Sequence, residues 1–317
     1  METESPESAQ QRFGWKIDIM NKFRGKAIIV VLTPAQARIA EDAGAGGVIP
    51  IDLIAEASVH TEGTARSTDL NTINNVMDRV VIPVIGRVRV GHVMEAKAME
   101  FAKVTCIDEN EFLNPITTKY DQSYPLHFTF TDGLNGADGY KHTVHTTYIY
   151  KQPFKIPFLC GAADLGEALK QIQAGASMIR TKMTISEDSH DVSKTFENVR
   201  KIFDEIELLS TEDEVGIYSR QSLYDVDIEL VRMVARDKRL PVPFFASGGI
   251  FMPIDAAMLM SLGCNGVIVS SRAFKTLDPE TRIRDIVTAV KHYREPARLA
   301  RIIERTGGYG PKPKTTG

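Results

Sequence analysis

Short apolar runs alternate with amphipathic stretches along almost the whole chain. The apolar runs are short and rich in β-branched residues, which is typical of parallel strands that are buried on both faces. Eight such runs are present, at residues 27–32, 46–51, 81–89, 104–110, 157–163, 177–183, 241–250 and 265–271. Each is followed by a helical pattern or a looser stretch, so the chain is predicted to repeat a strand-and-helix unit.

The starts and ends of the helical stretches carry recognisable capping residues. Thr33 is a predicted N-cap with Pro34 at the first helical position, and Asp164 with Glu167 resembles a capping box. In AEDAGAGGVIP, IQAGASMIR and MSLGCNGVIV, a helix-ending glycine comes a few residues before a buried strand. Further helices are predicted near residues 70–80, 91–103, 190–206, 226–238, 253–263, 278–293 and 295–306.

The eight units predict an α/β fold, a (β/α)₈ TIM barrel over residues 13–307 with an extra C-terminal helix. A doubly wound open sheet is the alternative, but no GxGxxG motif follows the first strand. Residues 1–12 and 308–317 are expected to be flexible ends. In a barrel, ligands meet the carboxyl ends of the strands, so polar residues there are the candidates for chemistry.

Residues 112–152 interrupt the repeat. They contain two alternating runs around a turn rich in glycine, asparagine and aspartate, which predicts a β-hairpin inserted after the fourth strand. The HTVH motif suggests a metal site, but His142 and His145 are three residues apart and point to opposite faces of a strand. We therefore expect no metal there and interpret the hairpin as solvent-exposed, with an interaction surface as a candidate role.

Composition mainly excludes other classes of protein. The 317 residues are 43% hydrophobic and 25% charged, and a net charge of −3 gives no reason to expect nucleic-acid or membrane binding. Cys106, Cys160 and Cys264 form no CxxC motif, so buried thiols in a reducing compartment are expected. Residues 1–11 are acidic and polar, so no secretory signal is expected, and no run of about 18 apolar residues predicts a membrane span. We expect a cytoplasmic protein.

The strand in PVIGRVRVGH, residues 83–92, ends in Arg87, Arg89 and His92, a basic group at the predicted ligand face. This segment and four others resemble the synthase subunit of the glutamine-dependent pyridoxal 5′-phosphate synthase, the PdxS/SNZ family. The other four are AQARIAEDAGAGGVI, PFLCGAADLGEAL, AGASMIRTK and FFASGGIFMPIDAAMLMSLGCNGVIVSS. The resemblance runs in register from about residue 13 to residue 293, apart from the inserted hairpin.

The resemblance implies a (β/α)₈ barrel that forms hexameric rings, usually stacked as dodecamers. It implies condensation of ribose 5-phosphate, glyceraldehyde 3-phosphate and ammonia into pyridoxal 5′-phosphate. Two lysines at strand ends carry the imine intermediates in succession, and a separate glutaminase subunit supplies the ammonia. The expected partners are therefore PdxS-type subunits, in a homo- or hetero-oligomer, with a glutaminase as a further candidate. No cofactor is expected.

Of the two lysine positions of the family, one is replaced in this chain and one is retained. Arg87 stands at the position of the first imine lysine. Imine formation needs a neutral amine, and a guanidinium is not deprotonated in proteins, so Arg87 is predicted to abolish that step. Arg87 can still bind a phosphate or a carboxylate. The second imine lysine is retained as Lys182, with Arg180 before it.

Other positions of the implied site are weakened. Val30 replaces an acid/base aspartate and is expected to be a barrel-interior core residue. MTISEDS replaces the glycine-rich phosphate loop that follows the second lysine, and it has two acidic residues and no glycine. Gly248 and Gly249 match the family's glycines after the seventh strand, whereas Ser270 and Ser271 replace a Gly-Ser pair after the eighth. Weak anion binding at these loops is expected to remain.

Some polar residues of the implied site are retained. Asp108 matches the family's acid on the fourth strand, and Arg89 and His92 match as well. We interpret these three mainly as a structural ion-pair network rather than as a catalytic group.

Losses concentrated at one site of an intact scaffold favour a pseudoenzyme. In this interpretation the chain is a PdxS-like subunit of vitamin B6 biosynthesis that co-assembles with an active synthase subunit and stabilises or regulates it. Two alternatives stay open. One is an active synthase that uses Lys182 alone, and the other is a protein repurposed to bind another sugar phosphate. The fold does not decide among them, because function depends on the site.

Overall fold

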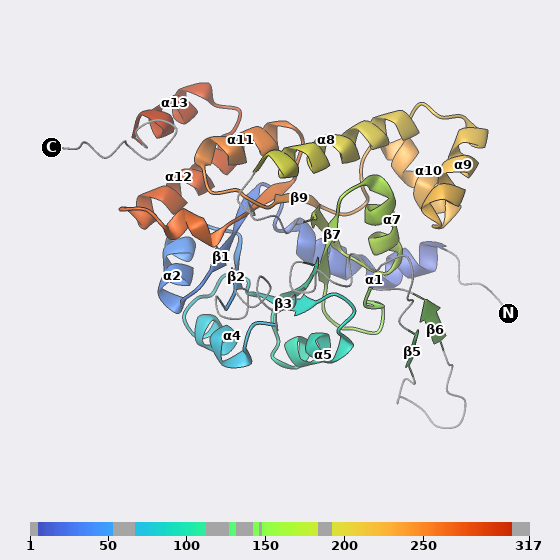
Figure 1. Ribbon diagram of the computed structural model, residues 1–317, viewed down its shortest axis with the longest axis horizontal. Helices are drawn as coiled ribbons and strands as arrows, with labels where there is room; N and C mark the ends of the chain where they lie inside the picture. Colours follow the sequence, from blue (N-terminus) through green and yellow to red (C-terminus); the bar gives the residue numbers. More distant parts are fainter. Residues whose placement is uncertain are drawn as a thin grey trace.

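The computed structural model describes residues 6–52, 67–111, 127–130, 142–145, 148–182 and 192–305 (Figure 1). Eight strands form one parallel sheet in the order β2-β1-β10-β9-β8-β7-β4-β3. These strands are β1 (Lys26–Val31), β2 (Gly47–Pro50), β3 (Ile85–Arg89), β4 (Cys106–Asn110), β7 (Phe158–Ala162), β8 (Met178–Thr181), β9 (Phe244–Ser247) and β10 (Gly266–Val269). Val48 and Val84 form a parallel bridge between the two edges of the sheet, so the predicted barrel is confirmed.

Helices surround the strands in Figure 1. They are α1 (Pro6–Asn21), α2 (Pro34–Asp42), α4 (Leu70–Met77), α5 (Val93–Phe101), α7 (Leu165–Gln173), α8 (Val192–Leu209), α9 (Glu214–Tyr224), α10 (Ile228–Asp237), α11 (Pro253–Ser261), the 3₁₀ helix η2 (Ser271–Phe274), α12 (Pro279–Lys291) and α13 (Pro296–Arg305). The extra C-terminal helix is confirmed as α13. The sequence pattern did not predict α9 or α1, and α1 occupies part of the segment that was expected to be a flexible end. None of the described helices combines the length and hydropathy that a membrane-spanning segment requires.

Part of the inserted hairpin is described. Strands β5 (His127–Phe130) and β6 (His142–His145) pair antiparallel and form a sheet separate from the barrel strands. A hairpin after β4 is therefore confirmed within the described residues. The two histidines of the HTVH motif lie on β6, and the other residues of the insertion before β5 and between the two strands fall outside the described residues.

The predicted helix ends form as expected. The Thr33 hydroxyl accepts a hydrogen bond from the Gln36 amide at 3.2 Å, and Pro34 begins α2. The three glycines of the repeated helix-to-strand joint, Gly44, Gly175 and Gly263, all have positive φ, at 85°, 99° and 110°. Because a side chain is strained in this region of backbone space, glycine ends each helix and turns the chain into the next strand.

The core has two layers that follow the alternation of the strands. On β1, Ile28 and Val30 point into the barrel, whereas Ile29 and Val31 pack between the strands and the helices. The inner layer is an apolar cluster made of Met20, Phe23, Ile28, Val30, Ile49, Ile51, Ile85, Cys106, Leu159, Met178, Phe245 and Ile268. All three cysteines are buried free thiols, as predicted. The interior of the barrel is therefore filled with side chains.

Candidate functional site

Three charged side chains enter the barrel above the apolar inner layer. Arg87, Asp108 and Arg180 each come two residues after a member of that layer, so the alternation of β3, β4 and β8 turns them inward. Arg87 Nε donates to Asp108 Oδ2 at 3.0 Å, and Arg180 Nε donates to Asp108 Oδ1, also at 3.0 Å. One carboxylate thus joins two guanidinium groups that come from different strands.

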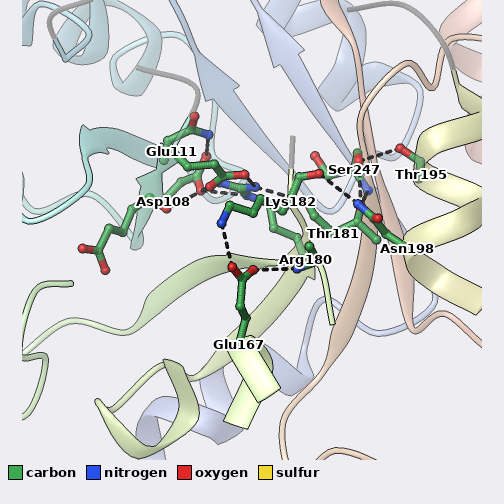
Figure 2. A network of polar contacts seen from close by, with 12 residues as sticks. Asp108, Glu111, Glu167, Arg180, Thr181, Lys182, Thr195, Asn198 and Ser247 are labelled. Carbon is green, nitrogen blue, oxygen red and sulfur yellow. Dashed lines mark hydrogen bonds and ion pairs between the residues drawn. The ribbon is translucent and has the colours of Figure 1, made fainter. Parts of the chain in front are cut away.

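Glu111 completes this network at the end of β4. Its two carboxylate oxygens accept from Arg180 Nη1 and Nη2 at 2.7 and 2.9 Å, a bidentate pair (Figure 2). Asn110 Nδ2 donates to Asp108 Oδ2 at 2.9 Å. Two positive and two negative side chains therefore balance within the barrel, and we call Arg87, Asp108, Glu111 and Arg180 the barrel network.

The barrel network is shielded from solvent. Asp108 and Arg180 have no exposed surface, and Arg87 and Glu111 are 3% and 6% exposed. Burial alone raises the pKa of Asp108, but the guanidinium groups of Arg180 and Arg87 outweigh it and hold that pKa below its ordinary value. Each charge is satisfied by a neighbouring charge, so Asp108 is a poor proton acceptor at neutral pH.

Gly161 makes room for the barrel network. A Cβ atom at this position would lie 2.5 Å from Glu111 Oε2 and 2.8 Å from Arg180 Nη1. Both neighbours are held by ion pairs, so neither yields without loss of a charged hydrogen bond. Glycine is therefore required by the close approach of the carboxylate and the guanidinium to the β7 backbone.

Gly161→Ala is expected to lower the free energy of unfolding by about 1–3 kcal/mol, because the added methyl overpacks the barrel network. Denaturant unfolding measures this change. Gly14→Ala in α1 is the matched control, since a Cβ there meets no atom within 4 Å and alanine favours a helix. An unchanged stability of Gly161→Ala, or an equal loss in both variants, would contradict the crowding at Gly161.

Neither Arg87 nor Val30 offers a reactive group at the position where the family resemblance implies one. Arg87 is committed to the buried pair with Asp108. Val30 is 7% exposed and belongs to the apolar inner layer, as expected for a core residue. This part of the barrel therefore presents an aliphatic side chain and a neutralised cation instead of an amine and a carboxylate.

Lys182 lies directly after β8 and is ion-paired with Glu167 of α7. Lys182 Nζ donates to Glu167 Oε1 at 2.8 Å (Figure 2). The other oxygen, Oε2, accepts from the Ala163 amide at 2.9 Å, and the Glu167 amide donates to Asp164 Oδ1. The capping-box residues thus also fix the partner of the lysine. To attack a carbonyl, a lysine amine has to be neutral and free of such a carboxylate partner.

The loops that match the family's phosphate site are held by internal hydrogen bonds. Gly248 and Gly249 have φ of 112° and 65°, which suits glycine, and the Thr195 hydroxyl of α8 donates to the Gly248 carbonyl at 2.8 Å. The Ser270 amide donates to the Ile250 carbonyl at 2.7 Å. The Ser270 hydroxyl accepts from the Arg272 amide at the start of η2.

The two serines after β10 and the loop after β8 complete the predicted site. Ser271 is the first residue of η2, and both serines are partly exposed. The MTISEDS loop falls outside the described residues. Weak anion binding by these segments therefore stays a prediction.

Arg89 and His92 do not join Asp108, which corrects the prediction of one network of these three residues. Arg89 Nη2 and Nε contact Glu95 Oε1 at 2.7 and 2.8 Å, and His92 Nδ1 accepts from the Glu95 amide at the start of α5. Alternation places Arg87 and Arg89 on the same face of β3, so their positions along the strand explain the correction. Arg89 is at the exit of β3 and reaches the following helix, whereas Arg87 stays inside the barrel.

A second buried ion pair lies on the outer side of β4 and was not predicted. Glu109 Oε2 and Lys151 Nζ are 2.8 Å apart, and both side chains are fully buried. Glu109 Oε1 also accepts from the amides of Gly91 and Ile149 at 3.0 and 2.7 Å. The pair ties β4 to the loop before α5 and to the chain that returns from the inserted hairpin. The alternation of CIDEN places Glu109 on the face of β4 opposite to Asp108, and this is the only sequence signal for the pair. No sequence pattern indicates that Lys151 is its partner.

A sequence model of the SOR/SNZ family matches residues 12–129 and 139–247. The chain is 38% identical over 295 residues to a probable pyridoxal 5′-phosphate synthase subunit pdx1 of Dictyostelium discoideum, covering 93% of this chain and 87% of that protein. It is 37% identical over 291 residues to the pyridoxal 5′-phosphate synthase subunit PdxS of Treponema denticola, covering 92% and 93%. The family match spans most of the barrel, and these relatives are covered almost end to end. The chain therefore belongs to the SOR/SNZ family.

Proposed function

We propose that this chain is a non-catalytic subunit of pyridoxal 5′-phosphate synthesis that co-assembles with a catalytic subunit of its family and stabilises or regulates it. The relatives named as synthase subunits support the pathway. The observation that carries the loss of catalysis is Arg87, which stands at the first imine position and is buried against Asp108 at 3.0 Å.

The chemistry at Arg87 does not allow the first covalent step. A guanidinium keeps its proton in proteins and offers no nucleophilic lone pair. The ion pair with Asp108 adds to this, because a substrate carbonyl would have to separate two buried charges before it reached the group. The first imine of the family's reaction therefore cannot form at this position.

The rest of the implied site supports the same proposal. Lys182 is tied to Glu167 at 2.8 Å, Val30 supplies no carboxylate, and the Ser270 amide is already bonded to Ile250. Val30 removes the acid/base group, and the Lys182 amine and the Ser270 amide are both engaged by groups of this chain. The active synthase that uses Lys182 alone would need the Lys182–Glu167 pair to open before any reaction.

The intact scaffold supports the assembly half of the proposal. The barrel strands are all formed, and the inner apolar layer and the helix-to-strand glycines are in place. A chain that keeps its fold and lacks its chemistry can still contribute surfaces to an oligomer. Its partners would be PdxS-type subunits in hexameric or dodecameric rings, with a glutaminase as a further candidate.

Co-expression with a catalytic family member tests this proposal. The tagged chain and an untagged catalytic subunit are purified together and weighed by native mass spectrometry. We expect rings that contain both chains in several ratios, and a change in the thermal stability or specific activity of the catalytic subunit. The tagged chain expressed alone is the control. Two separate populations with no mixed ring, and no effect on the catalytic subunit, would contradict the proposal.

A further inference from the structure

Arg180 has the geometry of an anion-binding group that the chain itself occupies. Its Nη1 and Nη2 donate to the two oxygens of Glu111 at 2.7 and 2.9 Å, the fork geometry with which arginine binds a free carboxylate. Glu111 is the member of the barrel network with the most exposed surface, although only 6%, and Arg180 behind it has none. The carboxylate of Glu111 therefore covers Arg180 on its more accessible side.

The guanidinium of Arg180 is held independently of Glu111. Its Nε donates to Asp108 Oδ1 at 3.0 Å, its Nη1 to the Thr181 carbonyl at 3.2 Å and its Nη2 to the Glu109 carbonyl at 3.4 Å. These contacts come from β4 and β8, so they remain when Glu111 is removed. Without the Glu111 carboxylate, Nη1 and Nη2 of Arg180 would still point to the space that this carboxylate fills.

Gly161 keeps that place open. A Cβ there would lie 2.5 Å from Glu111 Oε2 and 2.8 Å from Arg180 Nη1, so the space between β7 and the guanidinium is shaped for a carboxylate. The balance of charge also favours an anion at this place. Arg87 and Arg180 balance Asp108 and Glu111, and without Glu111 the buried network carries one uncompensated positive charge.

We infer that Arg180 and Gly161 form a carboxylate-binding site at the barrel mouth, and that Glu111 is its built-in occupant. The ligand class is a short monocarboxylate. Glu111→Ala removes one methylene and the carboxylate beyond Cβ, which together have the outline of acetate. In the wild-type chain the same contact excludes external anions from Arg180. The inference does not depend on the proposed loss of catalysis, because it concerns binding and stability alone.

Glu111→Ala titrated with sodium acetate tests this inference, with thermal unfolding as the measurement. The variant is expected to be less stable than wild type and to recover stability as acetate increases. At an acetate concentration ten times the dissociation constant, the folding equilibrium should shift about elevenfold. Formate should also bind, butyrate should not fit, and sodium chloride at equal ionic strength should give a much smaller shift.

Asp285→Ala is the matched control. Asp285 is also a buried carboxylate paired with an arginine, but Arg305 is about half exposed, so its loss leaves no enclosed site. Its stability and that of the wild type should not respond to acetate beyond the chloride effect. An unfolded Glu111→Ala would be refolded with and without acetate, and recovery only with acetate supports the site. No selective response to acetate in either format, or an equal response in Asp285→Ala, would overturn the inference.

Discussion

Asp108→Asn is expected to lower the free energy of unfolding by about 3–5 kcal/mol, the cost of breaking a buried ion pair by removing one partner. Asp108 accepts from Arg87 and Arg180 at 3.0 Å each, and all three side chains are essentially buried. The amide of asparagine places a neutral group between two guanidinium ions that water cannot reach. Their mutual repulsion and lost solvation are then uncompensated.

Urea unfolding at neutral pH measures this loss. Asp237→Asn is the control, because Asp237 pairs with Arg236 on the surface and its removal should leave stability unchanged. The double variant Asp108→Asn/Arg87→Met should be more stable than Asp108→Asn alone, since it removes one of the orphaned charges. A single variant as stable as wild type would show that the barrel network is not the closed, buried arrangement described above.

The effect of Asp108→Asn should depend on pH in a defined direction. The pKa of Asp108 is lower in the folded chain than its ordinary value of 3.8, so the folded state favours the ionised form. Stability from this group is therefore complete above about pH 4 and is lost as pH falls through the lower, folded-state value. The stability difference between wild type and Asp108→Asn should be constant from pH 7 to about 5 and should shrink as pH falls below 4.

The barrel could be predicted because its signals are local and repeated. Buried parallel strands have a distinctive composition, and the joints at Gly44, Gly175 and Gly263 need a backbone conformation that favours glycine. The inward direction of Val30 and Asp108 follows from the same alternation once the strands are placed. These features need no knowledge of which distant residues meet.

The partners of the charged residues could not be predicted in this way. Arg180 meets Glu111 across 69 residues of sequence, and Lys182 meets Glu167 from a different unit of the barrel. Such pairs depend on strand order and on how far each side chain reaches, which periodicity does not encode. The same limit explains why Arg89 was grouped with Asp108 although it contacts Glu95 on the following helix.

The hydrophobic pattern of the sequence also failed to predict two helices, α9 and α1. In α9, three large apolar side chains, Val215, Tyr218 and Leu223, face solvent, so no clear apolar stripe marks the helix. In α1, Met20 joins the inner barrel layer while Trp15 is 44% exposed. Their places are determined by packing against the completed barrel rather than by their own sequence period.

The second large effect is that this chain should form no imine with ribose 5-phosphate. Incubated with ribose 5-phosphate and reduced with borohydride, the wild-type chain should trap no sugar adduct. Arg87 offers no nucleophilic lone pair, and the Lys182 amine is ion-paired with Glu167 at 2.8 Å. Lys182→Arg sets the background, because any specific signal from this lysine disappears in it. A catalytic family member treated in parallel shows that the trapping conditions work.

Intact mass combined with peptide mapping after borohydride trapping tests the loss of catalysis most directly. We expect that the wild-type chain keeps its unmodified mass and that its signal equals that of Lys182→Arg. We also expect that no pyridoxal 5′-phosphate forms when glyceraldehyde 3-phosphate and ammonia are added. A pentose phosphate adduct mapped to Lys182, together with formation of pyridoxal 5′-phosphate by this chain alone, would contradict it.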